Sequence, residues 1–162
     1  MEAQGVAESK GWLLYAHPVF LERFELLTEQ VEGLRKEKPS EFHHHPIVKL
    51  YRCVSRGILE EVPTDPGAKQ FVLGATLGPK NKHWRRIKNR LPPRYRLFFQ
   101  FKTTVPRTVI YAWLNDEETL RAEGSKSDCY VVFEKMLSAG TIPTTWSELR
   151  AAAEVLEASK TA

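Results

Sequence analysis

The sequence predicts an α+β protein in which two N-terminal helices pack on a small antiparallel sheet of three to four strands, followed by C-terminal helices. Three observations support this class. Apolar residues recur at helical spacing up to residue 61, alternate with a period of two between residues 71 and 114, and return to helical spacing after residue 127. The 162 residues, 42% of them hydrophobic, suffice for one domain with a buried core. We expect residues 1–10, which are small and polar, to be flexible, and residues 11–162 to form the single domain.

Two helices are predicted in the first part of the chain. The run GWLLYAHPVF leads into the first helix, which has Pro18 in its first turn, where proline is tolerated. This helix should end near Lys38. Its apolar stripe comprises Phe20, Phe24, Leu27, Val31 and Leu34. Ser40 can cap the second helix, which Pro63 and the following turn should stop. Its stripe comprises Ile47, Leu50, Val54 and Ile58.

The middle of the chain is predicted to form the sheet. Phe71 and Leu73 indicate a short strand. Three longer strands follow in the runs HWRRIKN, RYRLFFQF and TVIYAWLND, the first two joined as a hairpin by NRLPP. Alternation within these strands predicts that Arg86, Lys88 and Arg96 lie on one concave face, with the two helices on the other.

Helical patterns return near the C-terminus. Ser127 or Asp128 can cap a helix that Gly140 ends. Thr145 and Glu148 have the spacing of a capping box that opens a last helix. A residue at the N-terminus of the helix that follows it is a simpler interpretation of Asp128 than a catalytic base.

The predicted sheet carries a marked excess of positive charge. Between Lys80 and Arg96 there are eight Lys and Arg residues, and no Asp or Glu occurs from Pro66 to Asn115. Because the whole chain is only +4, the remaining segments are net acidic. Such crowding of like charge is typical of a surface that binds a polyanion, and here indicates nucleic acid. The alternative is a solvated basic face without a ligand.

Other features exclude several function classes. Cys53 and Cys129 are far apart and fit reduced thiols in a cytoplasmic protein, and no apolar run reaches the roughly 18 residues of a membrane span. The adjacent histidines at 43–45 lack the spacing with which helix residues converge on a metal, so we expect neither a metal nor a cofactor.

Several runs carry a resemblance to a known family. These are GWLLYAHPVF, KNKHWRRIK, RYRLFFQF, WLNDEETLR, SKSDCYVVFEKML and TWSEL. In order and spacing they resemble the YhaV toxins of bacterial type II toxin-antitoxin modules, within the RelE-like group, over nearly the whole chain. The resemblance implies a RelE-like fold and an endoribonuclease that cleaves messenger RNA, often on ribosomes. It also implies inhibition by a PrlF-like antitoxin with an AbrB-type DNA-binding part, and operator DNA binding only as the toxin-antitoxin complex.

RNA cleavage without metal is chemically consistent with these residues. The ribose 2′-OH serves as nucleophile, so the protein must remove its proton, stabilise the phosphate transition state and protonate the leaving 5′-oxygen. The basic half lacks the carboxylate clusters that a two-metal route needs. Arginine and lysine can stabilise the phosphate instead, because guanidinium matches phosphate oxygens in a fork.

The resemblance assigns candidate site residues by matching single positions of this sequence to the family. Arg86 and Lys88 match the basic pair of the second strand, and Arg96 matches the phosphate-binding arginine of the third. Tyr130 matches the family tyrosine at the start of the next helix, where it can stack on a base or orient a proton; the alternative is a core aromatic.

The remaining candidates are less fixed by the pattern. The insertion NDEETLRAEGSKSD departs from the RelE pattern and leaves open whether Arg121 or Lys126 supplies the next basic group. The residues expected to bind RNA are Lys80, Lys82, Arg85, Arg94, Arg121 and Lys126. His83 is a possible general base, although alternation turns it away from Arg86. Asn115 fits a turn after the last strand. A second class of function is a non-catalytic module that binds nucleic acid or antitoxin and acts in transcriptional autoregulation.

Overall fold

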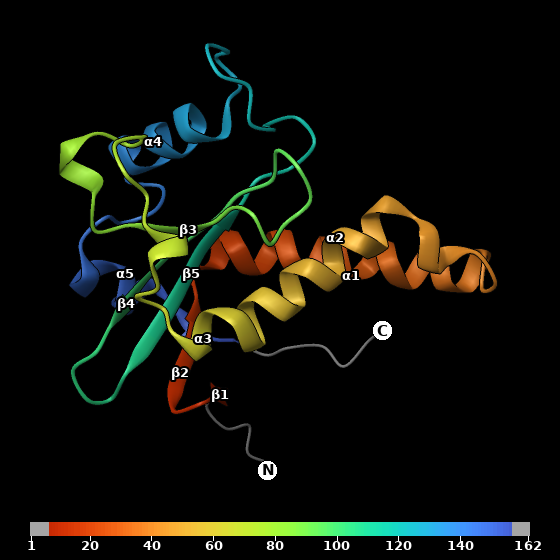
Figure 1. Cartoon of the computed structure of the whole chain (residues 1–162), viewed down its shortest axis with the longest axis horizontal. Coiled ribbons are helices and arrows are strands. Elements are labelled where there is room, and N and C mark those ends of the chain that lie inside the picture. The colour runs from red at the N-terminus through yellow and green to blue at the C-terminus, as the bar shows by residue number, and fades with distance from the viewer. Residues whose placement is uncertain (1–6, 157–162) are drawn as a thin grey trace.

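A mixed sheet lies between two layers of helices in the computed structural model, which describes residues 7–156 (Figure 1). The six strands of this part of the chain are β1 (Glu8–Ser9), β2 (Trp12–Ala16), β3 (Arg85–Ile87), β4 (Leu97–Lys102), β5 (Thr108–Leu114) and β6 (Glu154–Val155). Their order is β1-β2-β5-β4-β3, with β6 paired to β2. β2 and β5 run parallel, and the other pairs are antiparallel. The α+β class is confirmed, but the sheet is larger than predicted and mixed.

Helices cover both faces of this sheet. They are α1 (Pro18–Glu37), α2 (Pro46–Arg56), α3 (Val62–Thr64), α4 (Cys129–Ala139) and α5 (Trp146–Ala152). α1 and α2 pack on one face, and α4 and α5 on the other. The predicted second helix extends past α2 through a π-helical turn (Gly57–Glu61) into α3. Within residues 7–156, no helix combines the length and the apolar character needed to cross a bilayer.

Histidines cap the first two helices. His17 lies directly before Pro18, the first residue of α1, and its Nδ1 atom accepts a hydrogen bond from the N–H of Val19 at 3.1 Å. His45 caps α2 in the same way through the N–H of Ile47, so the expectation that Ser40 caps this helix is wrong. A ring nitrogen with a free lone pair can replace the usual hydroxyl or carboxylate oxygen at this position. No group of three or more His, Cys, Asp or Glu side chains suited to a metal occurs in the described part of the chain.

The N-terminal strands were not predicted. The run WLLYA forms β2, which is buried on both faces and therefore lacks the polar alternation of a half-exposed strand. Within the segment expected to be flexible, Glu8 and Ser9 pair with β2, whereas residues 1–6 lie outside the described range. The strand expected at Phe71 and Leu73 is instead a 3₁₀ turn (Lys69–Phe71) followed by a single bridge from Val72 to Arg85.

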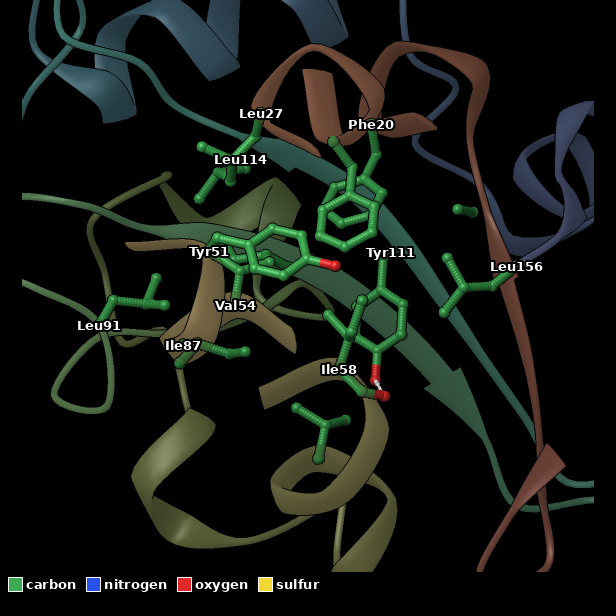
Figure 2. Close-up of a cluster of buried hydrophobic side chains, with 14 of the residues drawn as sticks. Phe20, Leu27, Tyr51, Val54, Ile58, Ile87, Leu91, Tyr111, Leu114 and Leu156 are labelled. Carbon is green, nitrogen blue, oxygen red and sulfur yellow. Dashed lines mark hydrogen bonds between the residues drawn. The ribbon is translucent and has the colours of Figure 1, made fainter. Parts of the chain in front are cut away.

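Two apolar cores follow from the two covered faces. Figure 2 shows the larger one, where the ring of Phe20 of α1 lies 6.0 Å from that of Tyr111 of β5 and Tyr51 of α2 stacks on Phe24 at 5.6 Å. The hydroxyl of Tyr111 donates to the carbonyl of Ile58 at 2.7 Å, which satisfies the polar atom of a fully buried ring. The second core lies between the sheet and α4 and is built on stacked rings of Phe98, Trp113 and Phe133. It supports the candidate site.

Candidate active site

Two arginines lie on the sheet face that α4 covers. Arg86 is in the middle of β3, opposite Phe98 of β4, whose ring stacks on Phe133 of α4 at 4.2 Å. Arg96 lies two residues before Phe98, so strand alternation directs it to the same face. The fold thus brings Arg86 and Arg96 to one side of the sheet, in line with the sequence-based expectation for these two residues.

Both arginines converge on Tyr130, the second residue of α4. Nη1 of Arg86 and Nε of Arg96 donate to its hydroxyl oxygen at 2.6 and 3.1 Å. The guanidinium of Arg121 lies over the ring, 4.9 Å from its centroid. We call Arg86, Arg96, Arg121 and Tyr130 the Arg–Tyr cluster. Because the hydroxyl accepts two hydrogen bonds, its own hydrogen is left for a third partner.

Asp128 orients two members of the Arg–Tyr cluster. It is 2% exposed and caps α4 by accepting from the N–H of Tyr130 at 3.1 Å. It also accepts from Nη1 of Arg121 at 2.9 Å and from the N–H of Ala122 at 2.6 Å. Burial by itself would raise the pKa of Asp128, but the three hydrogen bonds outweigh it and hold the pKa below its ordinary 3.8.

We expect the Asp128→Asn variant to be less stable than the parent by about 1–3 kcal/mol at pH 7, since it loses charged hydrogen bonds. Because folding lowers the pKa of Asp128, this stabilisation is complete above the unfolded value of 3.8 and is lost as pH falls through the folded value. The difference in unfolding free energy between parent and variant should therefore shrink below about pH 4. Urea unfolding at pH 7 and pH 3 measures it. An equal difference at both pH values would contradict the assigned role.

Arg86 has an unused donor. Its Nε is buried and has no hydrogen-bond partner in the structure, although Nη1 binds Tyr130. A buried donor without an acceptor is unfavourable unless a ligand supplies one. With three guanidinium groups against the single carboxylate of Asp128, the acceptor that fits is an anion. A phosphate group meets this charge requirement, since guanidinium binds phosphate oxygens through charge-assisted hydrogen bonds.

The predicted lysines lie outside these contacts. Lys88 is exposed, one residue beyond the end of β3. Lys80, Lys82 and Lys126 are also exposed, the first in a 3₁₀ turn and the last in the loop before α4. Exposed lysines on flexible stems attract a polyanion without fixing its geometry.

Arg85 and Arg94 are not members of the Arg–Tyr cluster. Arg85 points to the opposite face of the sheet, where its guanidinium lies 5.6 Å from the ring centroid of Phe101. Arg94 is exposed, and its Nε donates to the carbonyl of Arg121 at 2.9 Å. Arg94 therefore supports the loop that carries a member of the Arg–Tyr cluster, whereas Arg85 does not share a face with it.

His83 is bound to another part of the molecule. Its Nε2 lies 2.8 Å from the carbonyl oxygen of Thr144, in the loop before α5. Because a carbonyl only accepts, Nε2 carries the hydrogen in this contact. None of the hydrogen bonds of His83 in residues 7–156 reaches the Arg–Tyr cluster. The geometry thus gives no support to His83 as the general base.

Comparison with known proteins identifies the family. The model of a family described as toxins with endonuclease activity, of toxin-antitoxin systems, matches residues 14–154. The chain belongs to the YhaV toxin family. YhaV toxins of Escherichia coli O6:H1 strain CFT073 and of strain K12 are each 41% identical over 140 residues, covering 86% of this chain and 90% of theirs. The K12 protein is named a ribonuclease toxin. The search of solved structures gave no significant match.

Two residues in the matched range of this YhaV-family chain lie in surroundings that the sequence did not show. Arg96 was expected on the sheet face that the two N-terminal helices leave open, but α4 covers that face and leaves Arg96 8% exposed. Asn115 was interpreted as a turn residue and is fully buried. A polar side chain directly after the run VIYAWL was the one available signal for Asn115.

Proposed function

We propose that this YhaV-family toxin is a cytoplasmic endoribonuclease that cleaves messenger RNA without a metal ion, with the ribosome as its usual setting. The observation that carries the proposal is the convergence of Arg86 and Arg96 on the hydroxyl of Tyr130. The family description supplies the endonuclease activity, and the name of the K12 relative supplies the RNA substrate.

In the proposed reaction the ribose 2′-oxygen attacks the adjacent phosphorus and the bond to the 5′-oxygen breaks, leaving a 2′,3′-cyclic phosphate. The proton of the 2′-OH passes to a base, and a second proton passes to the 5′-oxygen. The guanidinium groups of Arg96 and Arg86 bind the phosphate oxygens, whose charge grows in the transition state. Lys88, exposed at the end of β3, is proposed to add positive charge beside the reacting phosphate.

Tyr130 has a proton-orienting role in this scheme. The ring is 4% exposed, with Phe98 edge-on at 5.6 Å and Arg121 over its face, so little surface remains for a nucleobase. The hydroxyl hydrogen, by contrast, is free to approach the 5′-oxygen of the leaving group. Of the two roles weighed from the sequence, base stacking fits the burial less well.

The RNA products test this proposal. A labelled RNA is incubated with the purified toxin in EDTA and, separately, with programmed ribosomes in magnesium. We expect 2′,3′-cyclic phosphate and 5′-hydroxyl ends, because the 2′-oxygen is the nucleophile. Cleavage to 3′-hydroxyl and 5′-phosphate ends would require activated water and would contradict the scheme. Intact RNA under both conditions would favour the non-catalytic alternative, a module that binds nucleic acid or antitoxin and acts in autoregulation.

Membership of a toxin-antitoxin family implies an antitoxin partner. We propose a PrlF-like antitoxin with an AbrB-type DNA-binding part, whose acidic segment covers the basic residues around β3 and β4. The absence of Asp and Glu from residues 66–115 supports a partner of opposite charge. Operator DNA would be bound only by the toxin-antitoxin complex.

A further inference from the structure

We infer that Asn115 is a positioning residue that sets the placement of Arg96 and of the loop carrying Arg121, an inference that rests on the function proposed above. Asn115 directly follows β5 and is 0% exposed. A buried amide needs partners for both its oxygen and its two hydrogens. Its partners all lie around the Arg–Tyr cluster.

The first contacts fix the backbone of Arg96. Oδ1 of Asn115 accepts from the N–H of Arg96 at 2.8 Å, and the N–H of Asn115 lies 3.3 Å from the carbonyl of Arg96. Arg96 precedes β4, whose ladder with β5 begins at the pair Leu97 and Leu114. Asn115 thus extends the pairing by one residue, because its side-chain oxygen binds the N–H of Arg96 and its backbone N–H binds the carbonyl of Arg96.

The amide nitrogen fixes the neighbouring loop. Nδ2 of Asn115 donates to the carbonyl of Arg94 at 3.1 Å and to the carbonyl of Thr119 at 2.9 Å. The carbonyl of Arg94 also accepts from the N–H of Arg121 at 2.9 Å. One side chain therefore joins the start of β4 to the insertion that contributes Arg121 to the Arg–Tyr cluster.

The backbone at Arg94 shows that this arrangement is imposed. Arg94 has a φ of 74°, in the left-handed region that non-glycine residues adopt at a cost of about 1 kcal/mol. Asn115 and Arg121 bind the carbonyl of that residue. From the other side, Arg23 of α1 donates to the carbonyl of Asn115 at 2.9 Å. The hydrogen bonds that Asn115 and Arg121 make to the carbonyl of Arg94 therefore offset the cost of its left-handed backbone, and they fix the chain just before Arg96.

Placement of Arg96 matters because its guanidinium has little freedom. Nε binds Tyr130 at 3.1 Å and Nη1 binds the carbonyl of Tyr95 at 2.9 Å. Arg96 thus presents a fixed set of donors only while its backbone stays in place. A shift of about 1 Å in a group that binds the reacting phosphate can lower a rate by about 10²-fold. Asn115 acts through Arg96, without touching substrate.

The test is the Asn115→Asp variant, which keeps the acceptor and the shape but loses both amide hydrogens. Gln100→Glu is the matched control, because Gln100 is also buried, at 4% exposed, and donates through Nε2 to the carbonyl of Thr144 at 2.9 Å. On ribosome-bound RNA, with rates referred to folded protein, we expect kcat of Asn115→Asp to fall about 10²-fold with KM within about 3-fold. Gln100→Glu should lower the melting temperature while kcat stays within about 3-fold.

A second measurement separates this inference from the proposed function. In NMR spectra the Nε–H signal of Arg96 should shift in Asn115→Asp and stay in place in Gln100→Glu. Asn115→Ser, which retains one short polar group, should give the same direction of change if Asn115→Asp does not fold. If the wild type fails to cleave RNA, the proposed function fails, and the NMR comparison still decides the role of Asn115. A folded Asn115 variant with the kcat of the wild type, or with an unmoved Arg96 signal, overturns the inference.

Discussion

Arg96→Lys is expected to lower RNA cleavage by about 10²–10³-fold while the protein remains folded. Lysine keeps the charge but presents a point charge in place of a planar fork, so it cannot reproduce the fixed directions in which Arg96 donates to Tyr130 and to a phosphate. Arg96 donates through Nε to Tyr130 at 3.1 Å and through Nη1 to the carbonyl of Tyr95 at 2.9 Å, and we propose that Nη2 donates to the phosphate. Single-turnover cleavage of labelled RNA measures the loss.

Arg107→Lys is the matched control for this substitution. Arg107 belongs to the same basic region and stacks on Trp12 at 4.8 Å, but it lies in the loop between β4 and β5, at the opposite end of β4 from Arg96. We expect its cleavage rate to stay within about 3-fold of the wild type, since only the net charge contributes there. Equal losses in both variants would mean that arginine geometry at position 96 is not the cause.

Tyr130→Phe is the second large expected effect, a fall of about 10²-fold in kcat. The ring and its packing on Phe98 remain, but Arg86 and Arg96 lose the oxygen to which both donate. The variant also loses the hydroxyl hydrogen proposed to approach the leaving oxygen. Unfolding free energy should fall by only about 1–3 kcal/mol, the cost of leaving buried donors unpaired.

Tyr111→Phe provides the comparison, because it removes the same atom from a buried tyrosine on the other face of the sheet. The hydroxyl of Tyr111 donates to Ile58 at 2.7 Å within the core shown in Figure 2. We expect a similar loss of stability and unchanged kcat. If Tyr130→Phe cleaves RNA at the wild-type rate, the hydroxyl has no role in the reaction and the proposed scheme must be revised.

The alternation of the middle strands predicted the shared face of Arg86 and Arg96, and the structure places both there. It could not predict what covers that face, because α4 lies more than thirty residues after Arg96 in the chain. Arg96 was therefore expected at the surface, whereas it is 8% exposed. The same limit applies to β2, which pairs with β5 across about ninety residues. Local patterns give the direction of a side chain, and long-range packing gives its environment.

The sequence by itself determined the α+β class, the helices α1 and α4, the excess of basic residues and the resemblance to the YhaV family. Each of these depends on residues close together in the chain or on overall composition. Only the tertiary structure decided that Asn115 and Asp128 hold the Arg–Tyr cluster, that Arg85 faces away from it and that His83 binds the loop before α5. Most of these contacts join segments that are separated in the chain, and their partners meet only once the sheet and its covering helices have assembled.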